Sequence, residues 1–345
     1  MQLGSMPLLK RWRLEQEAIT FAVVLLLVIL LAWGSPAFLD SNNLDSLQTS
    51  MAPNMIIAIG MMVLFIVGLF DLSVGAVMGL SGIITALVLS AGYGMGVAIV
   101  CGLGVGIGIG LLNGLLVAVF GINHLIATLG VMYMTRGVIE VLLLGAPLAG
   151  FTSFPAAFTM LGNGSIAGVY WMFLFALVLV VVGEFVLRRT VLGRRLYFTG
   201  GNHDAARLIG IDTKRMQIGA LVFSGFMAAL AGVLVTARIG MANRYLGIGL
   251  EMNIIIACLV GGGSIAGGKG SAIGAMLGVA FISLITNAFN LFEVPSAWQS
   301  SVIGAVLVVV VAIDGILLLR KQRVSWQTIL GWRSPRRNSA PLPAE

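Results

Sequence analysis

The stretch GGGSIAGGKGS, residues 261–271, has the residue types and most of the spacing of a phosphate-binding loop. Gly263, Gly268 and Lys269 stand where such a loop cradles the phosphates and places its positive charge. The loop also needs Ser or Thr directly after the lysine to bring a hydroxyl to Mg²⁺, and here that residue is Gly270. The sequence therefore predicts a glycine-rich turn at this position and no nucleotide site.

No other group of residues has the composition of a catalytic or metal site. A membrane enzyme would need a nucleophile, a base or metal ligands gathered in one place. His124 has no Asp, Glu or Cys clustered with it, and Cys101 and Cys258 each lie inside an apolar run, where packing is the simpler role. The sequence thus predicts no catalytic residue, no metal and no cofactor.

The composition predicts a helical membrane protein. Hydrophobic residues make up 59% of the 345 residues and charged residues only 10%, against about a quarter in globular proteins. The mean hydropathy is +1.06. The net charge of +7 comes from basic residues at the ends of apolar runs, which indicates membrane topology and contact with lipid, with no nucleic acid as partner.

The apolar runs place about ten membrane spans along the chain, at about 20 residues per crossing. The run from Ala18 to Trp33 exceeds the about 7–15 residues of a signal-peptide core, so it is read as an uncleaved span. The eighth span is too short for a straight crossing and is predicted to be broken or re-entrant. The ten spans are 18–39, 51–70, 72–91, 95–120, 123–145, 168–187, 217–238, 251–263, 270–292 and 297–319.

The basic residues orient these spans. They gather before the first span, in the 188–216 loop and after the last span, and such regions are cytoplasmic. The domain prediction is a cytoplasmic tail at 1–17, a single membrane domain at 18–319 and a basic cytoplasmic tail at 320–345. Both termini then lie inside the cell. Arg238 and Arg244 fall on the outer face, against the rule.

Glycine spacing predicts how the helices meet. Glycines that recur every four residues line one helix face and let a neighbouring backbone approach closely. Two such series are Gly102, Gly106, Gly110 and Gly114, and Gly270, Gly274 and Gly278.

Polar side chains within the apolar runs are candidates for a solute path. Uncharged polar groups suit a neutral, hydroxyl-rich solute better than an ion, although each also serves as a helix-to-helix hydrogen bond. Asp71 and Ser73 are alternatively caps for the helix that follows them. Arg136 and Glu140, four residues apart, are expected to pair with each other. The path candidates are Asp71, Ser73, Asn113, Asn123, Thr128, Asn253 and Asn287.

The 188–216 segment contains a candidate docking helix, GGNHDAARLIGI. Two glycines break the chain, Asn202 can cap, and a third glycine ends the short helix. Its apolar patch, with Ala205, Ala206, Leu208 and Ile209, suits a groove on another protein. The alternative is a solvated linker. The residues predicted to couple the two proteins are Gly200, Gly201, Asn202, Ala205, Ala206, Arg207 and Gly210.

Four ordered stretches resemble the ribose-type bacterial ABC importer permeases, a family that includes autoinducer-2 and other sugar importers. They are FDLSVGAVMGLSG, INHLIATLGVMYMTRGV, LGRRLYFTGGNHDAARLIGI and GIGLEMNIIIACLVGGGSIAGGKGSAIGAMLG. The resemblance implies an inner-membrane permease for a sugar or sugar-like solute, contacting a cytoplasmic ATPase through the third stretch. It also implies a periplasmic solute-binding protein and a second permease, identical or homologous. Asn123 and His124 depart from the prolines or small apolar residues usual in the family.

The rival prediction is an ion-coupled secondary transporter of a small polar solute. Such a transporter needs carboxylates or broken-helix ion sites near the middle of the membrane. The acidic residues here lie mostly near the ends of the predicted spans, which favours the importer permease.

Overall fold

The computed structural model describes residues 6–144, 151–152 and 154–295, and residues 298–299, 301–306, 308–309 and 312. The predicted C-terminal tail, 320–345, lies outside these residues, as does much of the predicted tenth span.

Long apolar helices dominate the described residues, and seven of them are long and apolar enough to cross a membrane. The seven are α1 (Met6–Gly34), α2 (Ser41–Val67), α4 (Met95–Gly114), α5 (His124–Leu142), α7 (Trp171–Arg189), α10 (Thr213–Ile239) and α12 (Ala272–Leu291). A π-helical turn, η2 (Leu115–Val119), continues α4.

Two further apolar helices, α3 (Val74–Ser90) and α11 (Leu250–Val260), are shorter. They coincide with the predicted third and eighth spans, and each follows a stretch without helix, residues 68–73 and 243–249. The prediction of a helical protein with several membrane spans is confirmed. The predicted number of about ten spans stays a prediction.

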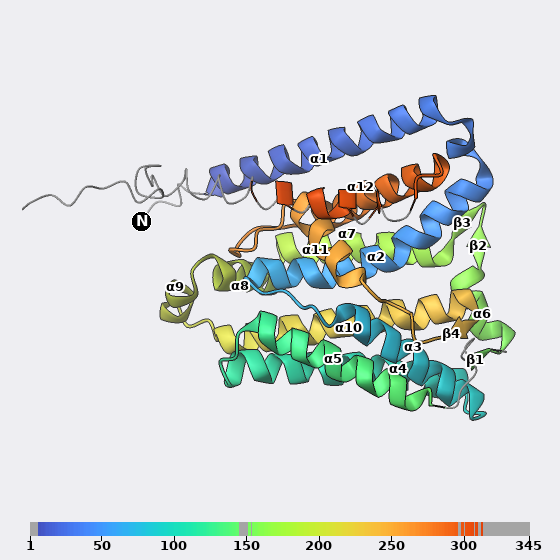
Figure 1. Ribbon diagram of the computed structural model, residues 1–345. Helices are drawn as coiled ribbons and strands as arrows, with labels where there is room; N and C mark the ends of the chain where they lie inside the picture. Colours follow the sequence, from blue (N-terminus) through green and yellow to red (C-terminus); the bar gives the residue numbers. More distant parts are fainter. Residues whose placement is uncertain are drawn as a thin grey trace, which may run out of the picture.

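The remaining elements are short and lie at the two ends of the bundle (Figure 1). At one end, called the α9 end, lie α8 (Val191–Gly201), α9 (His203–Leu208) and the start of α1. At the other, the α6 end, lie α6 (Ala156–Asn163) and two antiparallel strand pairs. β1 (Phe151–Thr152) pairs with β4 (Met241–Ala242), and β2 (Ser165–Ile166) with β3 (Val169–Tyr170). The 3-10 turn η1 (Pro36–Leu39) joins α1 to α2.

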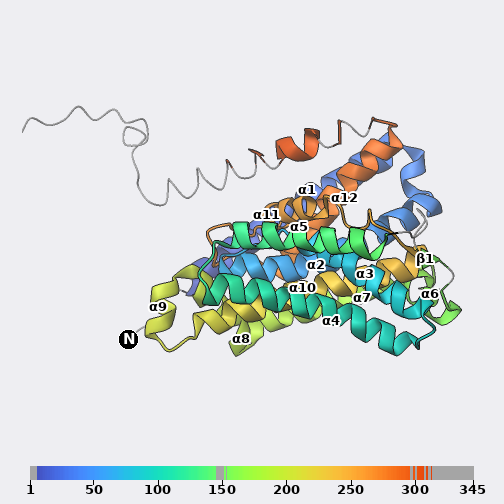
Figure 2. The same ribbon diagram turned by 60° about the horizontal axis from the view of Figure 1, so that its bottom comes forward.

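The core is built around α2 and α10, while α1 lies at the edge. The most apolar window of α2 is 83% buried, that of α10 is 61% buried, and that of α1 only 11%. α10 packs against α2, α3 and α4, and α1 packs against α12 (Figures 1 and 2). A helix that is apolar but covered so little faces the bilayer over most of its surface.

The predicted glycine faces are confirmed as sites of close packing. Gly106 in α4 and Gly225 in α10 approach so closely that a Cβ added to either would overlap the carbonyl oxygen of the other. A Cβ on Gly110 would lie 2.6 Å from the carbonyl oxygen of Leu221, and one on Gly278 would overlap that of Ala257 in α11. Only glycine lets these backbones pack at this distance.

Candidate functional site

A closed polar cluster surrounds the start of α3. Asp71 Oδ1 accepts hydrogen bonds from the Ser73 backbone N–H at 2.7 Å and the Ser73 hydroxyl at 2.6 Å. The Asn113 amide nitrogen donates to Ser73 Oγ at 2.9 Å, and Thr128 Oγ1 accepts from the Leu72 N–H at 3.2 Å. Asp71 therefore orders the turn before α3, as expected of a capping residue, although neither side chain bonds to a helical N–H of α3.

All four side chains of this cluster are buried, which bears on their predicted place along a solute path. Asp71, Ser73, Asn113 and Thr128 are all 0% exposed in the chain. A side chain with no exposed surface does not line a path along the outside of the chain.

The other three path candidates lie apart from the cluster. Asn123 is exposed and caps α5 by accepting from the Leu125 N–H at 2.9 Å. Asn287 in α12 donates to Asn43 of α2 at 2.6 Å, a bond between two helices. Asn253 is partly exposed in the first turns of α11. The structure therefore brings four of the seven candidates together and leaves Asn123, Asn253 and Asn287 elsewhere.

The expected pairing of Arg136 with Glu140 is wrong, because each side chain has a partner in the segment before α11. Arg136 Nη1 donates to the Leu246 carbonyl oxygen at 2.9 Å. Glu140 accepts from Arg244 Nη1 at 2.9 Å. Two side chains one turn apart on α5 thus fasten residues 244–246, and Arg244 is paired at the position where it breaks the positive-inside pattern.

Sequence reasoning missed Glu251, in the first turn of α11. Its Oε2 atom is buried and has no hydrogen-bond partner, and a Cβ added to Gly75 would lie 2.5 Å from it. An acidic residue inside a predicted span was the available signal.

The glycine-rich stretch 261–271 is a turn between α11 and α12, as predicted. Gly262, Gly267 and Gly268 have φ of +89°, +85° and +72°, values that L side chains rarely adopt. The turn is fastened to its surroundings: the Gly268 N–H donates to the Ile66 carbonyl at 2.9 Å, and the Tyr197 hydroxyl donates to the Gly270 carbonyl at 2.7 Å.

Contact with this turn explains why residue 200, shortly before the candidate docking helix α9, is a glycine. A Cβ on Gly200 would overlap the carbonyl oxygen of Ile66 and lie 2.9 Å from the Gly268 nitrogen. Nothing lies within 4 Å of a Cβ added to Gly201. Gly200 is therefore required by close contact between α8, the end of α2 and the turn, a contact here called the glycine joint (Ile66, Gly200, Gly267 and Gly268).

The candidate docking helix is α9, and its ends are capped as the sequence pattern predicts. Asn202 Oδ1 accepts from the Ala205 N–H at 2.9 Å, and Gly210 has φ of +82° directly after the helix. Arg207 folds back, because its Nε donates to Thr213 Oγ1 at 3.1 Å. The 188–216 loop is accordingly mostly helical: 188–189 belong to α7 and 213–216 to α10.

The apolar face of this helix differs from the predicted one. Ala206 is 1% exposed, so its methyl group packs inside the chain and does not belong to an outward face. Leu208 and Ile209 are 88% and 65% exposed, and Ala205 is exposed as well. The surface open to another protein is therefore formed by Ala205, Leu208 and Ile209.

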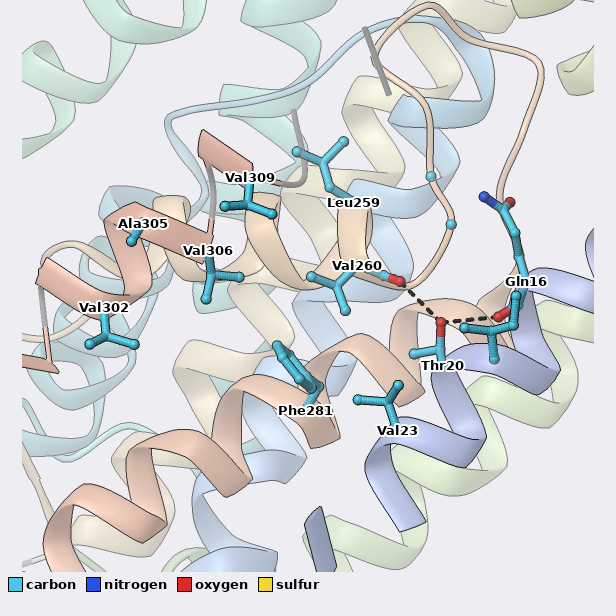
Figure 3. Close-up of a pocket in the computed structure, with 13 residues that line it drawn as sticks. Gln16, Thr20, Val23, Leu259, Val260, Phe281, Val302, Ala305, Val306 and Val309 are labelled. Atoms are coloured by element: carbon cyan, nitrogen blue, oxygen red, sulfur yellow. Dashed lines mark hydrogen bonds between the residues drawn. The ribbon is translucent and has the colours of Figure 1, made fainter. Parts of the chain in front are cut away.

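A cavity of about 620 Å³ lies between α1, α11, α12 and the side chains of Val302, Ala305, Val306 and Val309 (Figure 3). Its walls are aliphatic or aromatic carbon, including Val23, Phe281 and Val306. The polar groups lie at one end, where the Thr20 hydroxyl contacts the carbonyl oxygens of Gln16 and Val260. A hydroxyl-rich solute has few partners in such a cavity, so it is a poor candidate for the solute site.

Comparison with known proteins places this arrangement in a family. The family described as "Branched-chain amino acid transport system / permease component" matches residues 43–311. The chain belongs to this permease family. It is therefore a multi-pass membrane protein of the transport class.

Curated relatives cover most of the chain. The ribose import permease RbsC of Haemophilus influenzae is 32% identical over 90% of this chain and 96% of its own length. The autoinducer 2 import system permease LsrC of Salmonella choleraesuis is 36% identical over 86% of both chains, and that of Escherichia coli O157:H7 33% identical over 86% of this chain and 87% of its own length. No solved structure matches at a significant level.

Proposed function

We propose that the chain forms the translocation path of an inner-membrane ABC importer for a sugar or sugar-like solute. The relatives named above are import permeases for ribose and autoinducer 2, and their similarity extends along nearly the whole chain. On this proposal, ATP is hydrolysed by a separate cytoplasmic subunit and a periplasmic protein delivers the solute. A second permease, identical or homologous, completes the path.

The observation that carries this proposal is the exposed apolar end of α9. α9 is a short, capped helix at one end of the bundle (Figure 1), and Leu208 and the adjoining Ile209 are 88% and 65% exposed. Apolar side chains outside the membrane favour a protein partner over water. The ATPase subunit is the partner that an importer permease requires at its cytoplasmic end.

The arrangement of the ends supports the predicted orientation. The start of α1, α8 and α9 share one end of the bundle, and all three carry basic residues in the sequence. The α9 end is therefore assigned to the cytoplasm by the positive-inside rule. Three basic segments at one end of the bundle agree with an even number of membrane crossings between the start of α1 and α8.

The ion-coupled alternative lacks a matching cation site in the described part of the chain. The described residues contain no group of three or more His, Cys, Asp or Glu side chains that could hold a metal ion. The buried Asp71 is hydrogen-bonded to Ser73 and Asn113, and the Glu251 carboxylate lies against Gly75.

The test is a charge placed on the exposed face of α9. Leu208→Glu puts an unpaired carboxylate into the ATPase interface, at a cost of about 2–5 kcal/mol. We expect the variant to be folded and membrane-inserted, to capture at least about 30-fold less ATPase in co-purification, and to lose solute uptake. Ala206→Glu is a poorer test, since its buried position makes misfolding a competing explanation.

The matched control is Met160→Glu. Met160 is 54% exposed on α6, a short helix at the opposite end. This variant is expected to retain ATPase capture in full. If Leu208→Glu kept both ATPase and uptake, α9 would be a linker, and the importer assignment would lose its mechanical support.

A further inference from the structure

The two interrupted spans cross at their amino-terminal ends, where α3 and α11 begin. Gly75 in the first turn of α3 and Gly247 before α11 contact each other through their backbones, and a Cβ on either would overlap the carbonyl oxygen of the other. Gly247 and Gly249 both have φ of +74°. This place, residues 71–75 and 245–251, is called the crossing below. Irregular backbone at membrane depth is tolerated where protein or a water-filled path covers it.

One arginine and one carboxylate lie against α3 at the crossing. Arg136 Nη1 donates to the Leu246 carbonyl, and it lies 3.4 Å from where a Cβ on Gly79 would be. Glu251 Oε2 lies 2.5 Å from the same position on Gly75. Since Gly75 and Gly79 are one turn apart on α3, the guanidinium and the carboxylate lie over successive turns of one helix face. Glu251 attracts Arg136 electrostatically.

Several hydrogen-bonding atoms at and behind the crossing have no partner within the chain. They are Glu251 Oε2, Asp71 Oδ2 and Asn113 Oδ1, all buried. An unsatisfied buried polar atom costs about 1–3 kcal/mol, and more when it is charged. Of the three residues only Glu251 is partly exposed, so water or a ligand can complete its bonding.

The crossing is also close to the surface of the chain. Tyr245 and Ile248, on the segment that carries the Leu246 carbonyl, are 62% and 61% exposed, and Met252 is 47% exposed. Arg136 and Glu251 are themselves partly exposed. A solute moving along this face can therefore reach the pair, in contrast to the fully buried Asp71, Ser73 and Asn113.

We infer that Arg136 and Glu251 bind the hydroxyl groups of the transported solute, with the Leu246 carbonyl holding the guanidinium in place. This inference rests on the proposed import of a sugar or sugar-like solute. A neutral polyol both accepts and donates hydrogen bonds, so it can satisfy a guanidinium and a carboxylate together. Bonds to charged partners are the stronger ones, and a guanidinium presents its donors in a fixed plane.

The competing account is a charge pair that only neutralises itself within the membrane. The two accounts differ when the charges are exchanged. The double variant Arg136→Glu with Glu251→Arg keeps opposite charges over the same turns and loses the Arg136 bond to the Leu246 carbonyl, so a purely structural charge pair should keep part of its function. A solute site should not, because the exchange moves donors to where the solute offers hydrogen atoms.

The experiment measures uptake of tritiated aldopentoses and aldohexoses, with their deoxy analogues, by cells expressing the complete importer. For the best-transported sugar we expect Glu251→Gln and Arg136→Lys to lower uptake at least tenfold, with permease yield and ATPase capture unchanged. Preference for that sugar over its deoxy analogue should shrink in Glu251→Gln, because a site that bonds a hydroxyl discriminates strongly against its absence. The exchanged double variant should stay inactive.

The control is Asp40→Asn, which removes the charge of an exposed carboxylate before α2, outside the crossing. It should transport normally. Normal uptake by Glu251→Gln, or recovery in the exchanged double variant, would overturn the site. If the wild type imported no sugar of the panel while still capturing its ATPase, the proposed solute class would fail, and this site with it.

Discussion

Helix α4 carries two sets of glycines, and they have opposite surroundings. Gly102, Gly106 and Gly110 are buried against α3 and α10, where added Cβ atoms would meet backbone or side-chain atoms. Gly104 and Gly108 lie between them in the sequence, are exposed, and have no atom within 4 Å of an added Cβ. Within one helix, the same residue type therefore permits close packing on one face and leaves an open surface on the other.

The difference shows that four-residue spacing alone does not identify a packed face. Gly104 and Gly108 have the same spacing as Gly106 and Gly110. What separates them is the neighbouring helix, since Gly225 of α10 faces only the second pair. The open face meets lipid or another chain in the membrane.

The largest effect is expected for Gly106→Leu. The new side chain would overlap the backbone of Gly225 and force α4 away from α10. We expect at least about 3 kcal/mol of destabilisation, seen as loss of monodisperse protein in size-exclusion chromatography and a lower melting temperature. Wild-type melting behaviour would show that the contact is not needed.

The next largest effect tests the same contrast in α8, with Gly200→Ala against Gly201→Ala. Alanine favours helix at both positions, so only the clash with Ile66 distinguishes them. Gly200→Ala should cost about 1–3 kcal/mol and reduce uptake by disturbing the glycine joint, whereas Gly201→Ala should behave as wild type in both measurements. Equal behaviour of the two variants would contradict the role given to the joint.

A smaller effect is expected for Ser81→Ala in α3, which packs against the glycine face of α4. The buried Ser81 hydroxyl contacts the carbonyl oxygens of Gly102 in α4 at 2.8 Å and Ala229 in α10 at 3.1 Å. Hydrogen bonds between membrane helices contribute about 0.6 kcal/mol on average. Thermal unfolding in detergent should show a slight destabilisation, with uptake retained. A loss as large as that of Gly106→Leu would mean that this hydroxyl, and not glycine packing, holds the helices together.

The smallest effect is expected for Gly104→Leu on the open face. With space around it, the variant should unfold within about 0.5 kcal/mol of wild type. A marked loss of uptake at normal stability would instead indicate that a helix of a second permease packs against this face.

The sequence was sufficient for features that depend on composition and local pattern. Gly270 in place of a hydroxyl residue argued against a phosphate-binding loop, and the glycine series predicted that α4 packs closely against a neighbouring helix. Asn202 was placed correctly as a cap, because capping depends on residues three positions apart.

Features that depend on distant partners were not predictable in this way. Arg136 and Glu140 bond to residues 110 and 104 positions away, so their spacing within α5 gave the wrong partner. Ala206 is buried by packing of α9 against α8 and α10, which no local pattern reveals. The boundary before α3 was predicted at Asp71, but the full interruption over residues 68–73 was not, since Leu69, Phe70 and Leu72 continue the apolar composition of a span.

The contact of α1 with α11 and α12 has a consequence for biosynthesis. The Thr20 hydroxyl reaches the carbonyl oxygen of Val260, 240 residues later, and Leu31 and Phe38 pack in one cluster with Leu284 of α12. At about 5–20 residues per second, a ribosome takes roughly 12–50 s to make the intervening chain. During that interval α1 is already in the bilayer without its partner, so it must be stable there through lipid contact alone. A first helix that is apolar around most of its surface meets this requirement.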